Sequence, residues 1–219
     1  MTSISLIIVI QTLKCNLHFD FVLLCGERQR ILMTIDQIID NRYPLPQVSK
    51  QTLQKYIREI SFPKGHILLR AGHIERNIYF IKQGIVRAYA KTGDSETTFW
   101  FGKEGDAVIS MKSYVAGQKG YEDIELLENG LLYELNTRNL QQLFGRDIYI
   151  ANWGRKLAEQ ELVKTEERLI SQQFQTATER YKELLKSNPD LIRRVQLGYI
   201  ASYLGITQVS LSRIRAELK

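Results

Sequence analysis

Cysteine and histidine are scarce in this sequence, which limits the chemistry that it can support. Its two cysteines, Cys15 and Cys25, are too few for a disulfide framework or for a four-thiolate metal or iron–sulfur set. The three histidines, His18, His66 and His73, do not have the spacing of metal ligands, and the sequence contains no nucleophile elbow and no phosphate loop. We therefore expect no catalytic residue, no metal site and no enzymatic activity, and we expect a reducing cytoplasm as the compartment.

Long hydrophobic runs are also missing. The apolar runs Ile4 to Ile10 and Phe21 to Cys25 are separated by polar residues such as Lys14 and fall short of the roughly 18 residues that a membrane-spanning helix needs. No Lys or Arg precedes Lys14, so the pattern is not that of a secretory signal. We expect no membrane partner and interpret residues 1–32 as an N-terminal extension outside the folded domains, with Met33 as an alternative start.

Acidic residues are outnumbered by basic ones. The 219 residues include 30 Lys and Arg against 24 Asp and Glu, which gives a formal net charge of +6. This excess favours a polyanionic partner only weakly, because many basic proteins never bind nucleic acid. Hydrophobic residues make up 44% of the chain, which is enough for the packed core of one large domain or two ordinary ones.

Glycines recur between residues 62 and 135 and separate short runs rich in β-branched and aromatic residues. Four such runs are HILLR, IYFIKQ, IVRAYAK and ETTFWF. Short strands at roughly 8–12-residue spacing are typical of a β-sandwich or barrel. The turn Thr92-Gly93-Asp94-Ser95 predicts that IVRAYAK and ETTFWF pair as an antiparallel hairpin. Before this region, residues 37 to about 60 indicate two short helices on either side of a Tyr43–Pro46 break.

The second half of the chain is helical in pattern. Asn136 and Thr137 offer an N-cap for a helix over RNLQQLF, and a longer helical stretch runs from about Ile148 to Lys186. A helix of that length is not covered by a small β domain alone, so a second copy of the chain is its simplest partner. The alternative is a helix broken at Gly154 or near Gln172 and packed within one chain.

The last residues have the pattern of a helix-turn-helix. Apolar side chains recur at three- and four-residue spacing on both sides of a glycine: Leu197, Ile200, Ala201 and Leu204 before it, and Leu211, Ile214 and Leu218 after it. Gly205 is suited to the left-handed position that ends the first helix, and Thr207 to the N-cap of the second. Two helices joined by so short a turn predict a helix-turn-helix over residues 187–219.

The opposite face of the last helix is small and nearly neutral, so it can lie close to a DNA major groove. Arg213 is long enough to reach guanine O6 and N7, and Val209 can contact a thymine methyl. Gln208 can bond either an adenine edge or a phosphate. The predicted base-reading residues are Gln208, Val209, Ser212 and Arg213. The predicted phosphate contacts are Thr207 with the helix N-terminus, Arg193, Arg194 and Arg215.

Several stretches resemble one family. IASYLGITQVSLSRIR strongly resembles the C-terminal helix-turn-helix of the cyclic-AMP receptor protein and fumarate–nitrate regulator (Crp/Fnr) superfamily, and FPKGHILLRAGHIERNIYFIKQGIVRAYA resembles its cyclic-nucleotide-binding-type β-roll. The resemblance covers about Gln37 to Lys219. It implies an α+β fold with a β-roll (jelly roll) over residues 33–145, a dimerisation helix over 146–186 and the helix-turn-helix over 187–219.

The resemblance also implies a function. It is that of a homodimeric transcription regulator that binds a palindromic operator in double-stranded DNA, with RNA polymerase as a further partner. The family's base-reading positions fall on Gln208, Val209 and Arg213, but Val209 stands where the family usually has glutamate, so the familiar operator sequence is not expected. The alternative is a ligand-sensing or protein-docking module that does not read DNA.

The ligand pocket departs from the family pattern. Cyclic-AMP responders present a Gly-Glu pair and an arginine that neutralises the cyclic phosphate. Here Gly105 and Asp106 stand in for that pair, and no arginine lies between residues 102 and 128. Lys112 or Lys119 could supply charge, but lysine does not reproduce the bidentate arginine fork. We therefore expect no cofactor, and a roll that acts as a scaffold or takes another ligand in place of a cyclic nucleotide.

Overall fold

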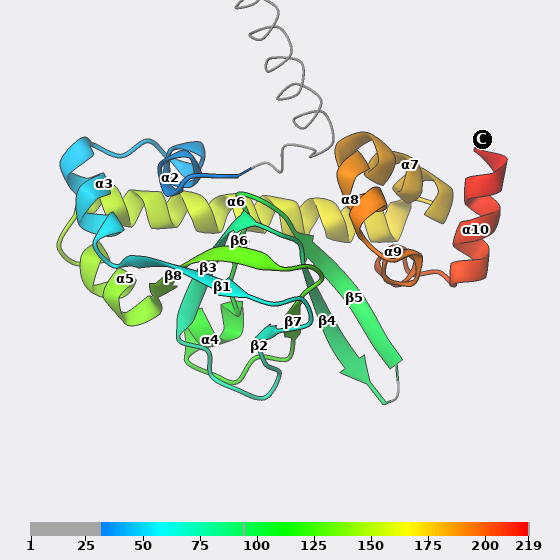
Figure 1. Ribbon diagram of the computed structural model, residues 1–219, viewed down its shortest axis with the longest axis horizontal. Coiled ribbons are helices and arrows are strands. Elements are labelled where there is room, and N and C mark those ends of the chain that lie inside the picture. Colours follow the sequence, from blue (N-terminus) through cyan, green and yellow to red (C-terminus); the bar gives the residue numbers. More distant parts are fainter. Residues whose placement is uncertain (1–31, 94, 219) are drawn as a thin grey trace, which may run out of the picture. The chain divides into compact units, whose positions relative to one another are not determined.

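The structure of the protein, a computed structural model, describes residues 32–93 and 95–218 (Figure 1). The interpretation of residues 1–32 as an extension therefore falls, except for Leu32, outside the described residues. No helix in the described part of the chain is both long enough and apolar enough to cross a membrane.

Within the described residues, two helices precede the first strand, as the sequence predicts. They are α2 (Ile35–Arg42) and α3 (Gln47–Gln54). The predicted second helix runs to about residue 60, whereas α3 ends earlier because the residues of strand β1 (Ile57–Phe62) pair with strand β8 (Gly130–Asn136) instead.

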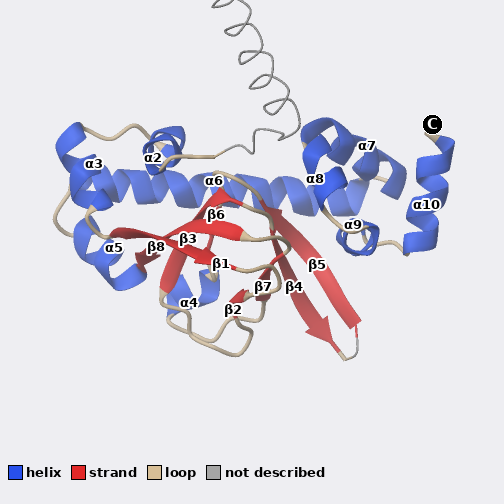
Figure 2. Cartoon of the chain, viewed as in Figure 1, coloured by secondary structure: helices blue, strands red, loops and turns tan. Residues whose placement is uncertain are grey.

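The strands of the described residues form two four-stranded antiparallel sheets, which confirms the predicted β-roll (Figure 2). One sheet has the order β1, β8, β3 (Asn77–Gln83) and β6 (Ala107–Val108). The other has the order β2 (Ile67–Leu69), β7 (Asp123–Leu126), β4 (Val86–Thr92) and β5 (Ser95–Gly102). Strands β4 and β5 pair along their length, so the predicted hairpin is confirmed. A short helix, α4 (Met111–Ala116), follows β6.

Strand β3 divides its side chains between two cores, because successive residues of a strand point to opposite faces. Tyr79 and Ile81 enter the core that also contains residues of both sheets. Ile78 and Phe80 face a second core, which is shared with the helices and centred on Trp153. The Trp153 side chain is fully buried, and its indole N–H donates to the Ile39 carbonyl at 3.1 Å, so burial leaves its polar atom satisfied.

The predicted dimerisation helix consists of two helices, which corrects the prediction of one continuous helix. Helix α5 (Thr137–Phe144) leads into α6 (Ile148–Phe174), which is followed by α7 (Ala177–Ser187). The break lies at Gln175, whose backbone is extended, and so is close to the alternative break near Gln172. Thr176 then begins α7 with a capping box, in which its hydroxyl accepts the Glu179 N–H.

The chain continues into three short helices: α8 (Pro189–Arg194), α9 (Leu197–Leu204) and α10 (Gln208–Glu217). Their apolar side chains form a third core together with Tyr181 and Leu184 of α7. Ile85, Phe101 and Leu127 of the β-roll belong to the same core. The C-terminal helices are therefore packed against the roll and are not separated from it by a solvated linker.

Candidate nucleic-acid interface

Helices α9 and α10 are joined by the turn that the sequence predicts. Gly205 has a φ of +69°, the left-handed conformation that glycine adopts without a steric cost, and it ends α9. The Ile206 N–H donates to the Ala201 carbonyl at 3.0 Å, which closes the turn. Thr207 then begins α10, because its hydroxyl accepts the Ser210 N–H at 3.1 Å. The predicted C-cap and N-cap are both confirmed.

The inner face of α10 is anchored by Leu211, which is fully buried with Leu204 of α9 in the third core. Ile214 is half-buried against the same core. Leu218 was predicted to face inward, but it lies beyond the end of α10 and is 39% exposed. The helix thus ends one residue too early for Leu218 to continue the apolar stripe.

The outer face of α10 carries the predicted base-reading residues. Gln208, Ser212 and Arg213 are exposed, and Val209 is 62% exposed although it is aliphatic. The Ser212 hydroxyl donates to the Gln208 carbonyl at 3.0 Å, which leaves its lone pairs available as acceptors. No ion pair holds the Arg213 guanidinium within the described ranges. All four side chains therefore lie on one exposed face, as the sequence predicts.

The predicted phosphate contacts lie in different surroundings. Arg215 is exposed on α10, and the Arg193 side chain is 64% exposed, with its nearest carboxylate, that of Asp190, 4.0 Å away. Arg194 differs, because its guanidinium forms hydrogen bonds to both Glu104, at 2.7 and 3.1 Å, and Glu128. Burial alone would lower the pKa of Arg194, but the hydrogen bonds to Glu104 and Glu128 outweigh burial and raise the pKa above its ordinary value. Sequence reasoning missed this pairing because both partners are far away along the chain.

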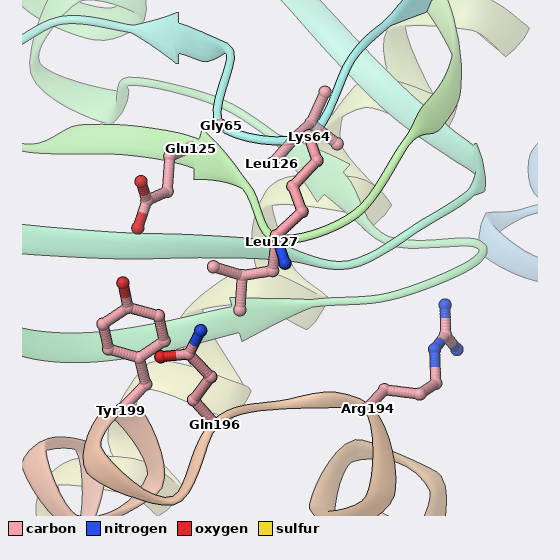
Figure 3. Close-up of a pocket in the computed structure, with 8 residues that line it drawn as sticks. All are labelled: Lys64, Gly65, Glu125, Leu126, Leu127, Arg194, Gln196 and Tyr199. Carbon is pink, nitrogen blue, oxygen red and sulfur yellow. The ribbon is translucent and has the colours of Figure 1, made fainter.

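A small cavity of about 160 Å³ lies where the β-roll meets α8 and α9 (Figure 3). The Tyr199 ring reaches into it from α9, with its hydroxyl end turned towards Glu125. Arg87 of the β-roll contacts both of these residues. Its guanidinium lies 3.9 Å from the centre of the Tyr199 ring and forms a 2.7 Å hydrogen bond to Glu125. The cavity therefore marks a junction held by charged groups. It contains none of the predicted ligand-pocket residues.

The predicted ligand-pocket residues lie on two stretches of the β-roll, one before β6 and one on and after α4. Gly105 and Asp106 lie in the turn between β5 and β6, where the Asp106 carboxylate is 3.1 Å from Lys164 of α6. Lys112 on α4 and Lys119 in the loop after it are exposed. No hydrogen bond or ion pair among the described residues joins either lysine to Asp106. A pocket built from these four residues stays a prediction.

The polar groups beside α4 do not suit an anionic cyclic phosphate. Ser110 and Glu122 are buried on either side of Gly120, where a Cβ would lie 2.6 Å from the Ser110 hydroxyl and 3.3 Å from the Glu122 carboxylate. Glu122 accepts the Tyr121 N–H at 2.9 Å, and the Ser110 hydroxyl has no hydrogen-bond partner among the described residues. Arg87 of strand β4 is held by two carboxylates, those of Glu96 and Glu125. A buried carboxylate without a free cation repels a phosphate.

Comparisons with known proteins agree with this architecture. Residues 59–147 match the family model of the cyclic nucleotide-binding domain. No curated protein sequence matches the chain significantly. The fold is similar to that of FixK2 from Bradyrhizobium japonicum, at 20% identity and a TM-score of 0.65, with 74% of this chain and 84% of that chain covered.

Two further solved structures are similar. One is a putative transcriptional regulator of the crp/fnr family from Eubacterium rectale, at 15% identity and a TM-score of 0.63, with 80% of this chain and 85% of that chain covered. The other is the Catabolite Activator Protein of Thermus thermophilus, at 20% identity and a TM-score of 0.52, with 80% of this chain and 84% of that chain covered. These matches confirm the predicted α+β fold class.

Proposed function

We propose that this chain, which has a cyclic nucleotide-binding domain and the fold of the Crp/Fnr superfamily, is a sequence-specific DNA-binding transcription regulator. The observation that carries the proposal is the contrast between the two faces of α10. Leu211 is fully buried on one face, whereas Val209 and Arg213 are exposed on the other. A regulator of this kind acts on chromosomal DNA in the cytoplasm, and RNA polymerase is its expected protein partner.

The exposed face of α10 suits a major groove because most of its side chains are small and only one of the base-reading residues, Arg213, is charged. Arg213 presents the planar donor fork that matches guanine O6 and N7, and Val209 supplies the apolar contact that fits a thymine methyl. Gln208 and Ser212 add hydrogen-bonding groups beside them. Thr207 with the helix N-terminus, Arg193 and Arg215 are the proposed phosphate contacts. Arg194 was predicted as a fourth, but its two carboxylate partners argue for a different role.

A homodimer is proposed from the exposed side of α6. Five large apolar side chains of α6 are each more than half exposed, although Trp153 and Leu157 of the same helix are buried: Leu162, Val163, Leu169, Ile170 and Phe174. Their spacing of four and seven residues forms a stripe, which we call the α6 stripe, that a second helix of the same kind would cover. A two-fold dimer calls for a palindromic operator with half-site centres about 34 Å apart.

The β-roll is proposed as a scaffold or as the site of a ligand other than a cyclic nucleotide. The buried carboxylate beside α4 and the engagement of Arg87 by Glu96 and Glu125 argue against an anionic phosphate there. Asp106, the predicted pocket residue, is held by Lys164 and has Arg42 at 3.8 Å. We therefore assign the proposed function no cofactor.

Selection of binding sites from randomised DNA duplexes tests the proposal. We expect the protein to enrich a palindrome, and Arg213→Ala to bind the selected site at least about 30-fold more weakly, since each half-site loses a bidentate guanine contact that contributes about 1–3 kcal/mol. The matched control is Arg138→Ala, which removes an exposed arginine from α5, remote in sequence from α10. Failure to enrich any sequence, or equal affinities of Arg213→Ala and the control, contradicts the proposal.

A further inference from the structure

The C-terminal end of α9 is held by two arginines that belong to other helices. Arg168 of α6 donates to the Tyr203 carbonyl, and Arg180 of α7 donates to the Leu204 carbonyl at 2.7 Å. Gln172 of α6 adds a 3.2 Å hydrogen bond to the Tyr203 carbonyl. The last carbonyls of a helix carry partial negative charge and lack partners within the helix, so cations are favoured there. Helix α6 is thus joined to the C-terminal end of α9 by direct hydrogen bonds.

Arg168 makes a second contact with the same residue of α9. Its guanidinium lies 3.6 Å from the centre of the Tyr203 ring, and that ring in turn lies 5.3 Å from the ring of Phe101 in strand β5. Burial lowers the pKa of Arg168, and the positive charge of Arg180 lowers it further, although Tyr203 opposes both. A planar arginine can stack on the ring and donate to the carbonyl at once, whereas a lysine cannot do both in this geometry.

The opposite end of the helix-turn-helix is held to the β-roll. Arg194, the last residue of α8, pairs with Glu104 in the turn after β5 and with Glu128 in the turn after β7. The Glu104 side chain is only 9% exposed and also accepts the Gly84 N–H at 2.9 Å. A third contact lies between these ends, where the Ser202 hydroxyl accepts the Thr98 N–H of β5 at 2.9 Å.

Helix α10 has little else to fix its direction. It follows α9 after the three residues 205–207, and Leu211 is its only fully buried side chain among those described. The orientation of α10 therefore depends on the orientation of α9. Arg168 belongs to the helix that carries the α6 stripe, next to Leu169, so it links the proposed dimer contact to α9 through one residue.

We propose that Arg168 and Arg194 are positioning residues, which fix α9 on α6 and on the β-roll and thereby set the distance between the two α10 helices of a dimer. This inference rests on the proposed function. It replaces the predicted phosphate contact of Arg194 by an intramolecular role and assigns Arg168 a role that its sequence position did not suggest. The neighbouring Arg193, which is largely exposed, keeps the phosphate role.

Operators with altered half-site spacing test this directly. Starting from the selected palindrome, the half-site centres are moved apart or together by one and two base pairs, and the affinity is measured for the protein and its variants. We expect the protein to lose about tenfold or more in affinity at the wrong spacing, and Arg168→Lys and Arg194→Ala to lose less than about threefold. In contrast, Arg193→Ala lowers affinity equally at every spacing and reduces the salt slope by about two, because each protomer loses one phosphate contact.

Hydrogen exchange without DNA provides the second measurement. We expect Arg168→Lys and Arg194→Ala to raise amide exchange at least about tenfold in α9 and α10, while exchange in the sheets of the roll stays unchanged, because a charged hydrogen bond contributes enough to change local opening by that factor. Arg138→Ala leaves both regions unchanged. Sedimentation checks that each variant has the same oligomeric state as the unmodified protein.

The outcomes separate the inference from the proposed function. If the variants keep both the spacing preference and the low exchange of α9 and α10, the positioning role is wrong even though DNA binding stands. If exchange rises in the variants as expected but the unmodified protein enriches no duplex, Arg168 and Arg194 still hold α9 in place and the proposed function is wrong. If exchange does not rise, the positioning role is overturned whether or not DNA is bound.

Discussion

Replacing Ile170 by glutamate places a carboxylate in the middle of the α6 stripe. Ile170 is 51% exposed in one protomer, so about half of the roughly 1.5–3 kcal/mol available from burying a whole isoleucine remains to be gained in a dimer. Each copy in the proposed two-fold dimer loses this amount, which brings the loss to about 2 kcal/mol per dimer. An unpaired carboxylate in that seam costs several kcal/mol more, and Glu166 on the same face of α6 adds repulsion.

These terms together predict that the dimer Kd of Ile170→Glu rises at least about 100-fold. The assay is sedimentation equilibrium over a series of protein concentrations, with circular dichroism to show that the helix content is unchanged. Ile170→Leu keeps the apolar volume and should dimerise as the unmodified protein does. An unmodified protein that is monomeric at every concentration, or an Ile170→Glu variant that dimerises as tightly as Ile170→Leu, would refute the reasoning.

Two further predictions concern the helix-turn-helix itself. Leu211→Ala opens a cavity in the third core and should lower the free energy of unfolding by about 3–5 kcal/mol. Val209→Ala on the exposed face should change that free energy by less than about 0.5 kcal/mol. Equal losses of stability in thermal melts of the two variants would contradict the assignment of the inner and outer faces of α10. Burial alone would raise the pKa of Glu104, but hydrogen bonds from Arg194 and from the Gly84 N–H lower it below its ordinary value. The stabilisation by Glu104 is therefore complete above pH 4.5 and is lost as the pH falls through the lowered pKa. Amide protection in α8 and α9 should weaken on acidification of the unmodified protein. The Glu104→Gln variant should show no such pH step.

The local signals in the sequence predicted the local structure well. Gly205 and Thr207 marked the turn between α9 and α10, and the spacing of apolar residues identified Leu211 as the inner anchor. The break between α6 and α7 was readable too, because Thr176 and Glu179 form the Thr-x-x-Glu pattern of a capping box. A break near Gln172 was the alternative to one continuous helix, and it was not preferred because neither glycine nor proline lies there.

The long-range contacts could not be predicted in this way. The partners of Arg194 lie in two turns of the β-roll, and only the folded sheets bring both to the end of α8. The same holds for Asp106, whose partners Arg42 and Lys164 come from helices α2 and α6, which are far apart in the sequence. A charged side chain that suggests a ligand contact can thus be paired with an opposite charge of the same chain. The periodicity of the sequence does not reveal such long-range pairs.

In the proposed complex with DNA, Arg213 reads a guanine edge from the exposed face of α10. Methylation interference on the selected operator tests it most directly, because dimethyl sulfate modifies guanine N7 in the major groove. We predict that methylation of one guanine in each half-site blocks binding of the unmodified protein and has no effect on the residual binding of Arg213→Ala. Interference confined to adenine N3 in the minor groove, or an identical pattern for both proteins, would contradict the account.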